Sequence, residues 1–420
     1  MIIQFHILQN YAPSNLNRDE NNRPKSAFFG GMERGRISSQ SLKRAMRRSK
    51  DWWCSAFDAE VLAERIKLPR VIRAELETMR AEGIVIDDAA LDAITKRVPD
   101  ILKKSEDNQN RPPADQEGDE QPALEENNAA GETKSRSTRR GKTEKLKSPE
   151  EAFEDMLSAG QLVYIAPNER RPLAKLLLEL YQSSPDNFTS LDLNKKLKEH
   201  KFKLTPRSVD IAMFGRMITS DAFDNVQASV QVAHAITTHK MVTETDYFTA
   251  LDDRLNQAGM LGDTEFNSGT YYKYIHIFWE GLSGNLPDDG EMARAAAIQL
   301  LQAAIYVQPT GKLNPFANFQ LPDFVLVEIR EKNLPLSYAN AFRKPLRAGE
   351  NDDLMMLSGT ALTDYLGRMS KMYCLTGNKE NKSNDKRAFI ASFDCSVPDA
   401  ERMNSVSELV EWLRADLLAR

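Results

Sequence analysis

The chain has 420 residues, of which 56 are Lys or Arg and 61 are Asp or Glu, so its formal net charge is −5, and 41% of its residues are hydrophobic. This composition is typical of a water-soluble protein with two or three domains. No apolar run approaches the roughly 20 residues of a bilayer-spanning helix, and the first residues lack the features of a signal peptide. We therefore expect a cytoplasmic protein with no membrane contact.

The cysteines and histidines do not predict a metal site. Cys54, Cys374 and Cys395 are too few and too scattered for a disulfide framework or a paired zinc site, so we expect reduced thiols packed in the fold. The five histidines are spread over different predicted elements; they are His6, His200, His234, His239 and His276. The sequence predicts no structural metal and no cofactor.

The first 50 residues are strongly basic although the whole chain is acidic. They hold ten Lys and Arg side chains against three acidic ones, a local net charge of +7. A surface built from this segment would attract polyanions.

The N-terminal segment predicts a strand, a loop and a basic helix. Met1 to Gln9 alternates apolar and polar residues, as a half-buried strand does. A long polar loop is expected from Asn10 to Arg36. The helix that follows has Ser38 or Ser39 as its N-cap, and its basic residues face away from its apolar side.

Residues 51–200 carry mostly helical patterns. Within them, residues 104–148 contain no aromatic residue and almost nothing apolar, begin acid-rich and end base-rich. Such a segment cannot bury enough apolar surface to offset its chain entropy, so we interpret 104–148 as a disordered charged insertion.

The second half of the chain completes an alternating pattern of strands and helices. We predict strands at 209–213, 270–279 and 323–330 and a helix at 288–307, while residues 216–270 are interpreted as an excursion with glycine turns. Together with the N-terminal strand and helix, this is the strand–helix–strand–strand–helix–strand order of a ferredoxin-like α+β fold. Two more helices are expected near 354–370 and at 405–420.

The predicted basic helix could bind phosphate at its beginning. Backbone N–H groups around Ser38, Ser39 and Gln40 point outward at the positive end of the helix dipole. Lys43 and Arg47 lie four residues apart on one face, and the loop before the helix adds Arg18 and Lys25. The alternative is a surface helix whose basic stripe is simply solvated; the combined charge favours nucleic-acid binding.

Evidence for catalysis is weaker. The chain has no phosphate-binding glycine loop followed by Lys and Ser or Thr, and no G-x-S-x-G motif. Asp19 could position a metal or activate a ribose hydroxyl, although an Asp beside arginines more often orders its own loop. Apolar and aromatic residues at 242–272, and Met217, could stack on bases or could be core residues.

Six sequence blocks together resemble one known family. The blocks are SNLNRDENNRPKSAFFGGMERGRISSQSLKRAMRRS, VDIAMFGRMITS, AHAITTHK, DYFTALDD, LGDTEFNSGTYYKY and LPLSYANAFRKP. In this order they are similar to the CasC-type backbone subunits (Cas7 family, Cse4 subfamily) of type I-E CRISPR Cascade complexes. Residues 104–148 depart from the family pattern.

The resemblance implies an RRM-like palm with a helical fingers insertion and a thumb β-hairpin. The corresponding domains are the palm at 1–50, 203–241 and 273–420, the fingers at 51–202 and the thumb at 242–272. It also implies a set of CRISPR RNA contacts, at Arg18, Lys25, Ser38, Ser39, Gln40, Lys43, Arg47, Arg216, Met217, Phe248 and Leu261. Met217 and Leu261 would be the wedge that kinks the guide RNA, and Lys195, Lys196 and Lys198 would contact target DNA.

The function implied by the resemblance is that of a non-catalytic scaffold. Copies of the chain would stack head to tail along the guide spacer and present it for pairing with target DNA, so that sequence recognition is left to base pairing. The further partners would be the large, small, repeat-handle-processing and 5′-end-capping Cascade subunits. The alternative is a metal-dependent endoribonuclease acting through Asp19, because related type III backbone subunits cut target RNA with a loop aspartate.

Overall fold

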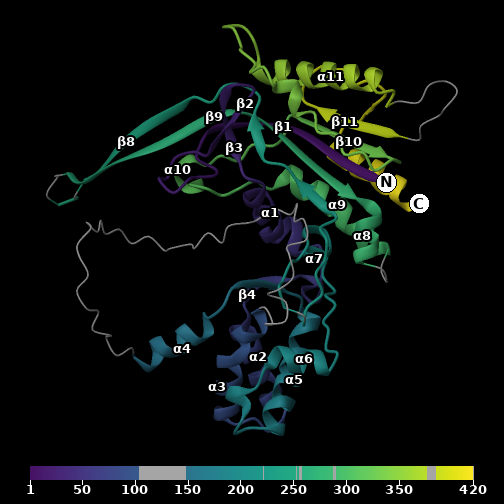
Figure 1. Ribbon diagram of the computed structural model, residues 1–420. Helices are drawn as coiled ribbons and strands as arrows, with labels where there is room; N and C mark the ends of the chain where they lie inside the picture. Colours follow the sequence, from purple (N-terminus) through teal and green to yellow (C-terminus); the bar gives the residue numbers. More distant parts are fainter. Residues whose placement is uncertain are drawn as a thin grey trace.

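The computed structural model describes residues 1–103, 148–220, 222–251, 253–254, 258–286, 290–375 and 385–419. It contains a broad sheet with helices on both faces, a helical unit below the sheet, and a long hairpin that projects to one side (Figure 1). The predicted insertion at 104–148 lies outside the described residues, apart from its last residue, Ser148, which caps a helix.

The middle of the sheet confirms the predicted α+β fold class. Its strands are β10 (Phe324–Arg330), β1 (Ile2–Ser14), β9 (Ala258–Phe278) and the short β6 (Val230–Val232) and β7 (Ala235–Thr237), which both pair with β9. All these pairs are antiparallel, and the order is the ferredoxin-like one, with the fourth, first, third and second strands side by side. The sheet continues into β11 (Lys386–Ala391) and β12 (Glu401–Arg402) at one edge.

Residues 10–36, predicted as a loop, contain strands at the other edge of the sheet. β1 runs on to Ser14, and β2 (Ser26–Phe29) and β3 (Met32–Ile37) form a hairpin that joins the sheet through β7. Gly30 and Gly31 make its two-residue turn, with φ of 61° and 79°. Two successive positive φ values are typical of such turns, which favour glycine.

The predicted strand at 209–213 is wrong, because these residues form helix α7 (Val209–Phe214). Ser208 accepts a hydrogen bond from the N–H of Ile211 and begins the helix, and Gly215 ends it with a φ of 76°. Serine before the first turn and glycine after the last turn are common at the two ends of a helix. The missing strand is supplied by β6 and β7, inside the segment that we interpreted as an excursion.

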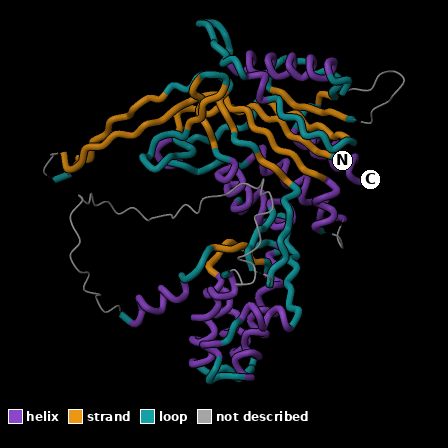
Figure 2. Tube along the Cα trace, in the orientation of Figure 1, coloured by secondary structure: helices purple, strands orange, loops and turns teal. Residues whose placement is uncertain are grey.

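Helices cover both faces of the sheet (Figure 2). Ile3, Phe5 and Ile7 of β1 pack in one core with α1 (Ser39–Arg48), α9 (Gly290–Tyr306) and α12 (Val406–Leu418). Leu8 packs in a second core, on the opposite face, with α11 (Leu354–Met372). The predicted helices at 38–49, 288–307, 354–370 and 405–420 are therefore confirmed.

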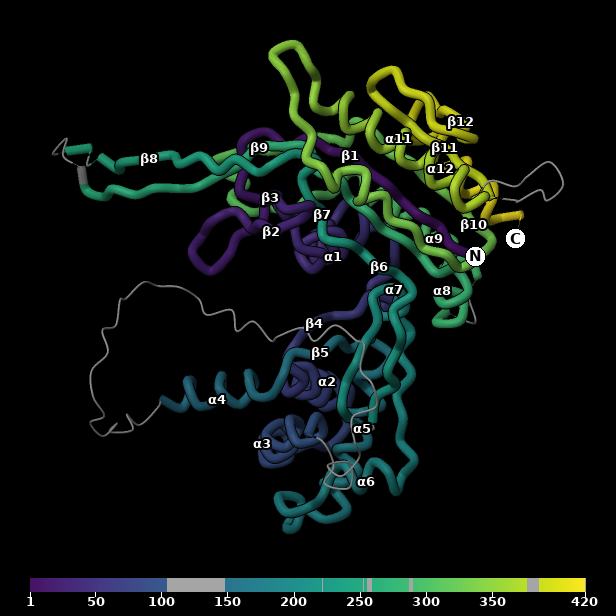
Figure 3. Tube along the Cα trace, turned by 45° about the horizontal axis from the view of Figure 1, so that its top comes forward, coloured from purple at the N-terminus to yellow at the C-terminus, as the bar shows by residue number. Residues whose placement is uncertain are grey.

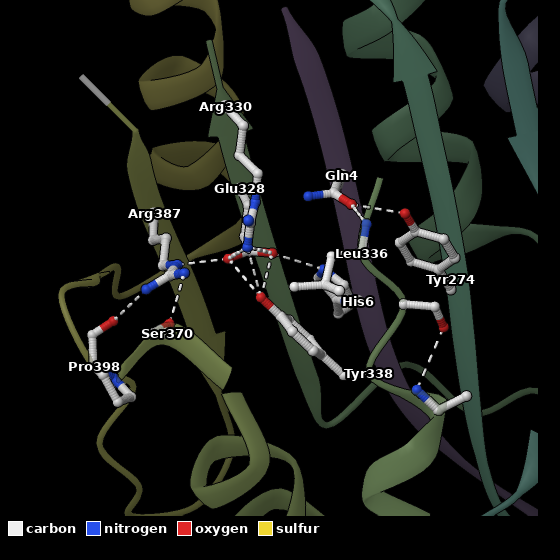
Figure 4. A network of polar contacts seen from close by, with 12 residues as sticks. Gln4, His6, Tyr274, Glu328, Arg330, Leu336, Tyr338, Ser370, Arg387 and Pro398 are labelled. Carbon is white, nitrogen blue, oxygen red and sulfur yellow. Dashed lines mark hydrogen bonds and ion pairs between the residues drawn. The ribbon is translucent and has the colours of Figure 1, made fainter. Parts of the chain in front are cut away.

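A buried polar network fixes the α11 side of the sheet (Figure 4). The Glu328 carboxylate accepts hydrogen bonds from His6 Nε2 at 3.0 Å, from Arg387 Nε at 2.5 Å and from the Tyr338 hydroxyl at 3.1 Å. Burial alone would raise the pKa of Glu328, but hydrogen bonding to His6 and the charges of Arg330 and Arg387 hold it well below its usual range. The network joins β1, β10, β11 and the segment before α11 into one unit.

The helical unit below the sheet has its own core. It contains α2 (Leu68–Ala81), α3 (Asp88–Arg97), α4 (Pro149–Leu157), α5 (Pro167–Ser183) and α6 (Leu193–Glu199), with a small sheet of β4 (Glu64–Lys67) and β5 (Leu162–Ile165). The predicted helical character of 51–200 is confirmed, although the strand pair β4–β5 was not predicted. Among the described helices, none is long and apolar enough to cross a membrane.

The long hairpin consists of β8 (Thr243–Leu251) and the outer part of β9. β9 is one strand of 21 residues: residues 258–267 pair with β8, and residues 267–278 pair with β1 (Figure 3). The predicted strand at 270–279 is therefore the inner end of a longer strand, and Gly259, Gly262 and Gly269 lie within it. β9 itself runs without interruption from the sheet into the hairpin, although the register shifts between Tyr11 and Ser14 of β1 at the junction.

The inner part of β9 carries a buried cation. Lys273 is 3% exposed, and its Nζ donates a hydrogen bond to the carbonyl oxygen of Ala304 at 3.2 Å, near the C-terminal end of α9. Burial lowers the pKa of Lys273 to about 7.

Several short elements complete the described chain. They are the π-helical turn at Lys50–Cys54, α8 (Trp279–Asn285), α10 (Leu313–Phe316) and 3₁₀ turns at Ala59–Val61, Val98–Leu102, Phe188–Ser190 and Ala339–Phe342. All three cysteines are free thiols, but Cys54 and Cys374 are exposed, which corrects the expectation that they pack in the fold.

Candidate nucleic-acid interface

The beginning of α1 is fixed by its neighbours. Ser38 is the N-cap, and its hydroxyl accepts a hydrogen bond from the N–H of Ser41 at 3.3 Å. The N–H of Ser39 donates to His234 Nδ1 at 2.9 Å, and the N–H of Ser38 donates to Asn17 Oδ1 at 2.9 Å. Three N–H groups at the start of the helix, those of Ser38, Ser39 and Ser41, already donate hydrogen bonds. The predicted phosphate site therefore offers fewer N–H donors than the sequence indicated, and the exposed Gln40 lies at its centre.

The basic loop, residues 17–25, lies directly beside the start of α1. Asn17 joins the two, because the same residue also accepts a hydrogen bond on its carbonyl from the N–H of Lys25 at 2.9 Å. Arg18 is exposed and donates to Asn22 Oδ1 at 3.1 Å. The structure thus brings Arg18, Lys25 and the first turn of α1 onto one surface, with the half-buried Lys43 one turn further along the helix.

Asp19 orders its own loop. One carboxylate oxygen accepts hydrogen bonds from the backbone N–H groups of Asn21 and Arg23, each at 2.9 Å. Within the described residues, no group of three or more His, Cys, Asp or Glu side chains is arranged to hold a metal ion. The geometry at Asp19 matches the loop-ordering interpretation and gives the nuclease alternative no support.

Arg47 faces inward. Its Nε lies 3.1 Å from Asp210 Oδ1, its Nη1 donates to the Tyr164 hydroxyl at 2.6 Å, and its guanidinium lies 4.4 Å from the centre of the Tyr164 ring. Burial raises the pKa of Asp210, although the charge of Arg47 and hydrogen bonds from Arg47, Ala63 and Trp53 oppose that rise. In this structure the guanidinium joins α1 to α7 and β5 and is not presented to a ligand.

Arg216 is also committed to a carboxylate. Its Nη1 and Nη2 lie 2.6 Å and 2.8 Å from the two oxygens of Glu169, and both side chains are almost fully buried. The next residue, Met217, is 80% exposed. Arg216 therefore anchors the loop that presents Met217, and only the methionine is available for contact.

The β8–β9 hairpin offers apolar side chains and acidic charge. Phe248 is 40% exposed and covers Gly262, its cross-strand neighbour, while Leu261 is 59% exposed and pairs with Thr249. Phe248 and Leu261 thus lie on opposite faces of the hairpin. Neither residues 243–251 nor residues 258–269 include a Lys or Arg. The charged residues in these two ranges are all acidic: Glu244, Asp246, Asp263 and Glu265.

The lysines predicted to contact DNA lie on α6, in the helical unit. Lys195 and Lys198 are exposed, and Lys196 Nζ lies 2.6 Å from Glu199 Oε2. α6 is far from the β8–β9 hairpin in both the ribbon and the tube views (Figures 1 and 3). The predicted residues therefore fall into separate places: the basic loop with the start of α1, the Met217 loop, the hairpin and α6.

The sequence analysis did not identify two residues that contact the predicted site residues: Asp210, which pairs with Arg47, and His234, which contacts Ser39. Asp210 was assigned to a strand, and His234 was considered only as a metal ligand. The signal for Asp210 was local, because Ser208 and Gly215 mark the ends of a helix. The contact between His234 and Ser39 joins residues 195 positions apart and has no local signal.

Comparison with known proteins gives a consistent result. The family model of CT1975-like proteins, Cas_CT1975, matches residues 3–412. A solved chain of a "CRISPR RNA-guided surveillance complex, pre-nicking" has the same fold, with a TM-score of 0.70 and 24% identity over 99% of this chain and 100% of that chain. A chain of a "CRISPR RNA-guided surveillance complex" matches with a TM-score of 0.65 and 21% identity over the same shares. No curated protein matches the sequence. Because the family model spans nearly the whole length, the chain belongs to the family of CT1975-like proteins.

Proposed function

We propose that this protein is a guide-RNA-binding subunit of a CRISPR RNA-guided surveillance complex. The similarity in fold to chains of such complexes covers 99% of this chain and 100% of each of those chains. It supports an equivalent place in a complex of this kind.

The observation that carries the proposal is the surface formed by the basic loop and the start of α1. Arg18 is exposed there, Lys25 and Lys43 are half-buried, and the backbone around Ser38 is held in place by Asn17 and His234. Such a surface binds phosphates without reading bases, which suits a guide whose sequence varies. The exposed Met217, Phe248 and Leu261 add apolar groups that can stack on or separate bases.

The finer features of the proposal follow the family resemblance. The complex is of type I-E, several copies of the chain follow the spacer head to tail, and the guide is kinked at intervals by Met217 and Leu261. Lys195, Lys196 and Lys198 contact target DNA, and the large, small, repeat-handle-processing and 5′-end-capping subunits complete the assembly in the cytoplasm. The chain itself performs no chemistry.

The proposal is tested by purifying the chain from cells that express a CRISPR array and the partner subunits. We expect RNA of discrete length to copurify with the wild type and to be lost from a Lys25→Ala, Lys43→Ala double variant. A Lys332→Ala, Lys371→Ala variant is the matched control, since both lysines are exposed and lie outside the basic loop and α1, Lys332 just after β10 and Lys371 in α11. Absence of RNA from the wild-type complex would refute the proposal.

Asp19→Ala separates a scaffold from a nuclease. The substitution removes two backbone hydrogen bonds of the basic loop. We expect the assembled complex to protect the same guide and to bind target with little change. Loss of target-RNA cleavage in the variant, where the wild type cleaves, would establish the enzymatic alternative.

A further inference from the structure

A pocket of about 290 Å³ lies where the basic loop meets the root of the β8–β9 hairpin. Its walls are residues 21–23 of the loop, residues 263–265 of β9, and Lys312, which directly precedes α10. Lys312 belongs to none of the sequence blocks that indicated RNA binding. It comes from a third segment of the chain, yet it lies beside residues from both of the other two.

The segment that carries Lys312 is tightly fixed. A Cβ atom on Gly311 would lie 2.3 Å from the carbonyl oxygen of Leu16, so this glycine packs tightly against the segment just after β1. The ring of Phe316, in α10, packs against Phe266 of β9 with centroids 5.6 Å apart. These contacts hold Lys312 at the root of the hairpin, where its Nζ donates to Thr264 Oγ1 at 3.0 Å.

Lys312 is held in an unfavourable backbone conformation. Its φ is 45°, in the left-handed region that side-chain-bearing residues rarely adopt, and Ala317, at the other end of α10, has a φ of 44°. Backbone strain of this kind costs energy and is found mainly where the surrounding structure imposes it, often at functional sites. A glycine at position 312 would remove this strain.

The cations around the pocket are unevenly compensated. Arg23 lies 3.2 Å from Glu265, and its charge is neutralised by that pair. Asp19, on the same loop, is bound to backbone N–H groups. Asp263 and Glu265 also line the pocket, and Glu265 is already paired with Arg23. Burial and the charge of Arg18 lower the pKa of Lys312, and the charge of Asp263 opposes that fall. Two neighbouring cations that repel each other are stabilised by an anion placed between them.

We propose that this pocket binds a phosphate group of the nucleic-acid strand, with two cations: Lys312 in its wall, and Arg18, which lies beside the wall residue Asn22 and is hydrogen-bonded to it. Thr264 orients the ammonium group of Lys312, and Asn22 orients the guanidinium of Arg18 through the hydrogen bond to its Oδ1. The proposal rests on the guide-binding function proposed above and adds a residue and a position to it. A phosphate in this pocket touches the loop, the hairpin and the α10 segment together, and so ties the root of the hairpin to the guide.

The test uses the full chain and a labelled single-stranded RNA of spacer length. Lys312→Gly removes the cation and relieves the backbone strain, so the variant should fold at least as stably as the wild type. Loss of one phosphate contact lowers the salt dependence of binding by about 0.7 in log–log slope, and the affinity about fivefold at 0.1 M salt. Lys332→Gly, an exposed lysine in another loop, is the matched control and should leave both quantities unchanged.

A double variant shows whether the two cations share one phosphate. If they do, adding Arg18→Gln to Lys312→Gly should weaken binding by less than the product of the two separate effects. Lys312→Arg should retain most of the affinity. Wild-type affinity and salt slope in Lys312→Gly, with a wild type that binds RNA, would overturn the inference and leave the proposed function intact.

Inorganic phosphate distinguishes failure of the pocket from failure of the proposed function. If the wild type binds no RNA, the proposed function fails, and the pocket is then tested by thermal unfolding with inorganic phosphate against the same ionic strength of chloride. A stabilisation by phosphate that Lys312→Gly abolishes supports a phosphate site independent of RNA. Equal responses of the two proteins to phosphate overturn the inference.

Discussion

The central sheet and the β8–β9 hairpin share strand β9, but the sheet is buried between helices and the hairpin is exposed to solvent. In the sheet, the inner part of β9 lies between β1 and the β6 and β7 strands, and helices cover both of its faces. In the hairpin, every residue of β8 is exposed, and the outer part of β9 pairs with β8 alone. The same backbone ladder thus passes from the most buried part of the protein to one of its most exposed parts.

This difference separates residues that maintain the fold from residues that are available to bind a ligand, a distinction that the sequence alone does not make. Near the sheet and α1, Arg216 and Glu328 are buried, Arg47 is half-buried, and all three are paired, so they maintain the fold. In the hairpin and the basic loop, Phe248, Leu261 and Arg18 are exposed, so they are available for contact. Substitution of the paired side chains near the sheet and α1 should change the stability of the protein. Substitution of the exposed side chains in the hairpin and the basic loop should change RNA binding.

The largest expected effect is that of Arg47→Ala. Asp210 is almost fully buried; without Arg47 it keeps the hydrogen bonds from Ala63 and Trp53 but loses its paired cation. Removing one partner of a buried ion pair typically costs about 3–5 kcal/mol of unfolding free energy. Urea unfolding followed by circular dichroism measures it. Arg48→Ala, an exposed arginine at the next position of α1, is the control and should change stability by less than about 0.5 kcal/mol. Equal effects of the two substitutions would contradict the inward role of Arg47.

Phe248→Ala tests the exposed side of the comparison. Stacking of a base on an aromatic ring contributes about 1–3 kcal/mol, so RNA binding should weaken by that amount while the unfolding free energy barely changes. Fluorescence anisotropy and urea unfolding give the two quantities. Thr245→Ala, on the same strand, is the control. A variant that loses stability but keeps its RNA affinity would show that Phe248 serves the hairpin itself.

Lys273→Met examines the buried end of β9 through its pH dependence. The pKa of Lys273 is about 7 in the folded protein and has its ordinary value of 10.5 in the unfolded chain. Below pH 7 both states are protonated and the folded protein bears the full cost of the buried charge. As pH rises from 7 toward 10.5, only the folded protein releases the proton, so stability should increase by about 1 kcal/mol per pH unit.

The methionine variant lacks this titration. Its unfolding free energy should exceed that of the wild type at pH 7, and the difference should shrink as the pH rises to 9. Urea unfolding at pH 7, 8 and 9 measures the difference. A gap that stays constant over this range would mean that Lys273 titrates near its ordinary pKa.

The smallest effect is expected for Lys25→Gln in the basic loop. One phosphate contact fewer should lower the log–log salt slope of RNA binding by about 0.7, equally for every RNA sequence. Titrations with two unrelated RNAs between 50 and about 200 mM salt measure it. Lys332→Gln provides the control, and a loss confined to one of the RNAs would indicate base reading in place of phosphate binding.

The order of elements could be predicted because the hydrophobic period of a long segment indicates whether it forms a helix or a strand. The N-terminal strand, the helices at 38–49 and 288–307 and the strand at 323–330 are segments of this kind. The expectation of a half-buried N-terminal strand was wrong, because β1 and β10 are buried on both faces and their polar residues Gln4, His6 and Glu328 are buried with them. Short elements gave no such signal. β6 and β7 have three residues each, and the six residues of α7 are too few to distinguish a helical period from a strand period.

The candidate site could be predicted only in its charge. Ten cations in 50 residues indicate a polyanion-binding surface, but the sequence does not say which cations face a carboxylate. Asp210 pairs with Arg47 across 163 positions, and Glu169 pairs with Arg216 across 47. Such pairs are formed by the tertiary fold and leave no local pattern. Lys312 could not be predicted for the same reason: its neighbours in the pocket come from two distant segments of the chain, residues 21–23 and 263–265.

The continuity of β9 limits how this protein can change over evolutionary time. Side chains alternate between the two faces of a strand, so inserting a single residue at the junction of the hairpin and the sheet would turn every later residue of β9 to the wrong face. The hairpin can be lengthened or shortened without that damage only at its tip, and most simply by matched pairs of residues on both strands. Relatives that differ in hairpin length should therefore differ beyond Leu251, where the register already shifts, while the junction near Asn267 keeps its single irregularity between Tyr11 and Ser14.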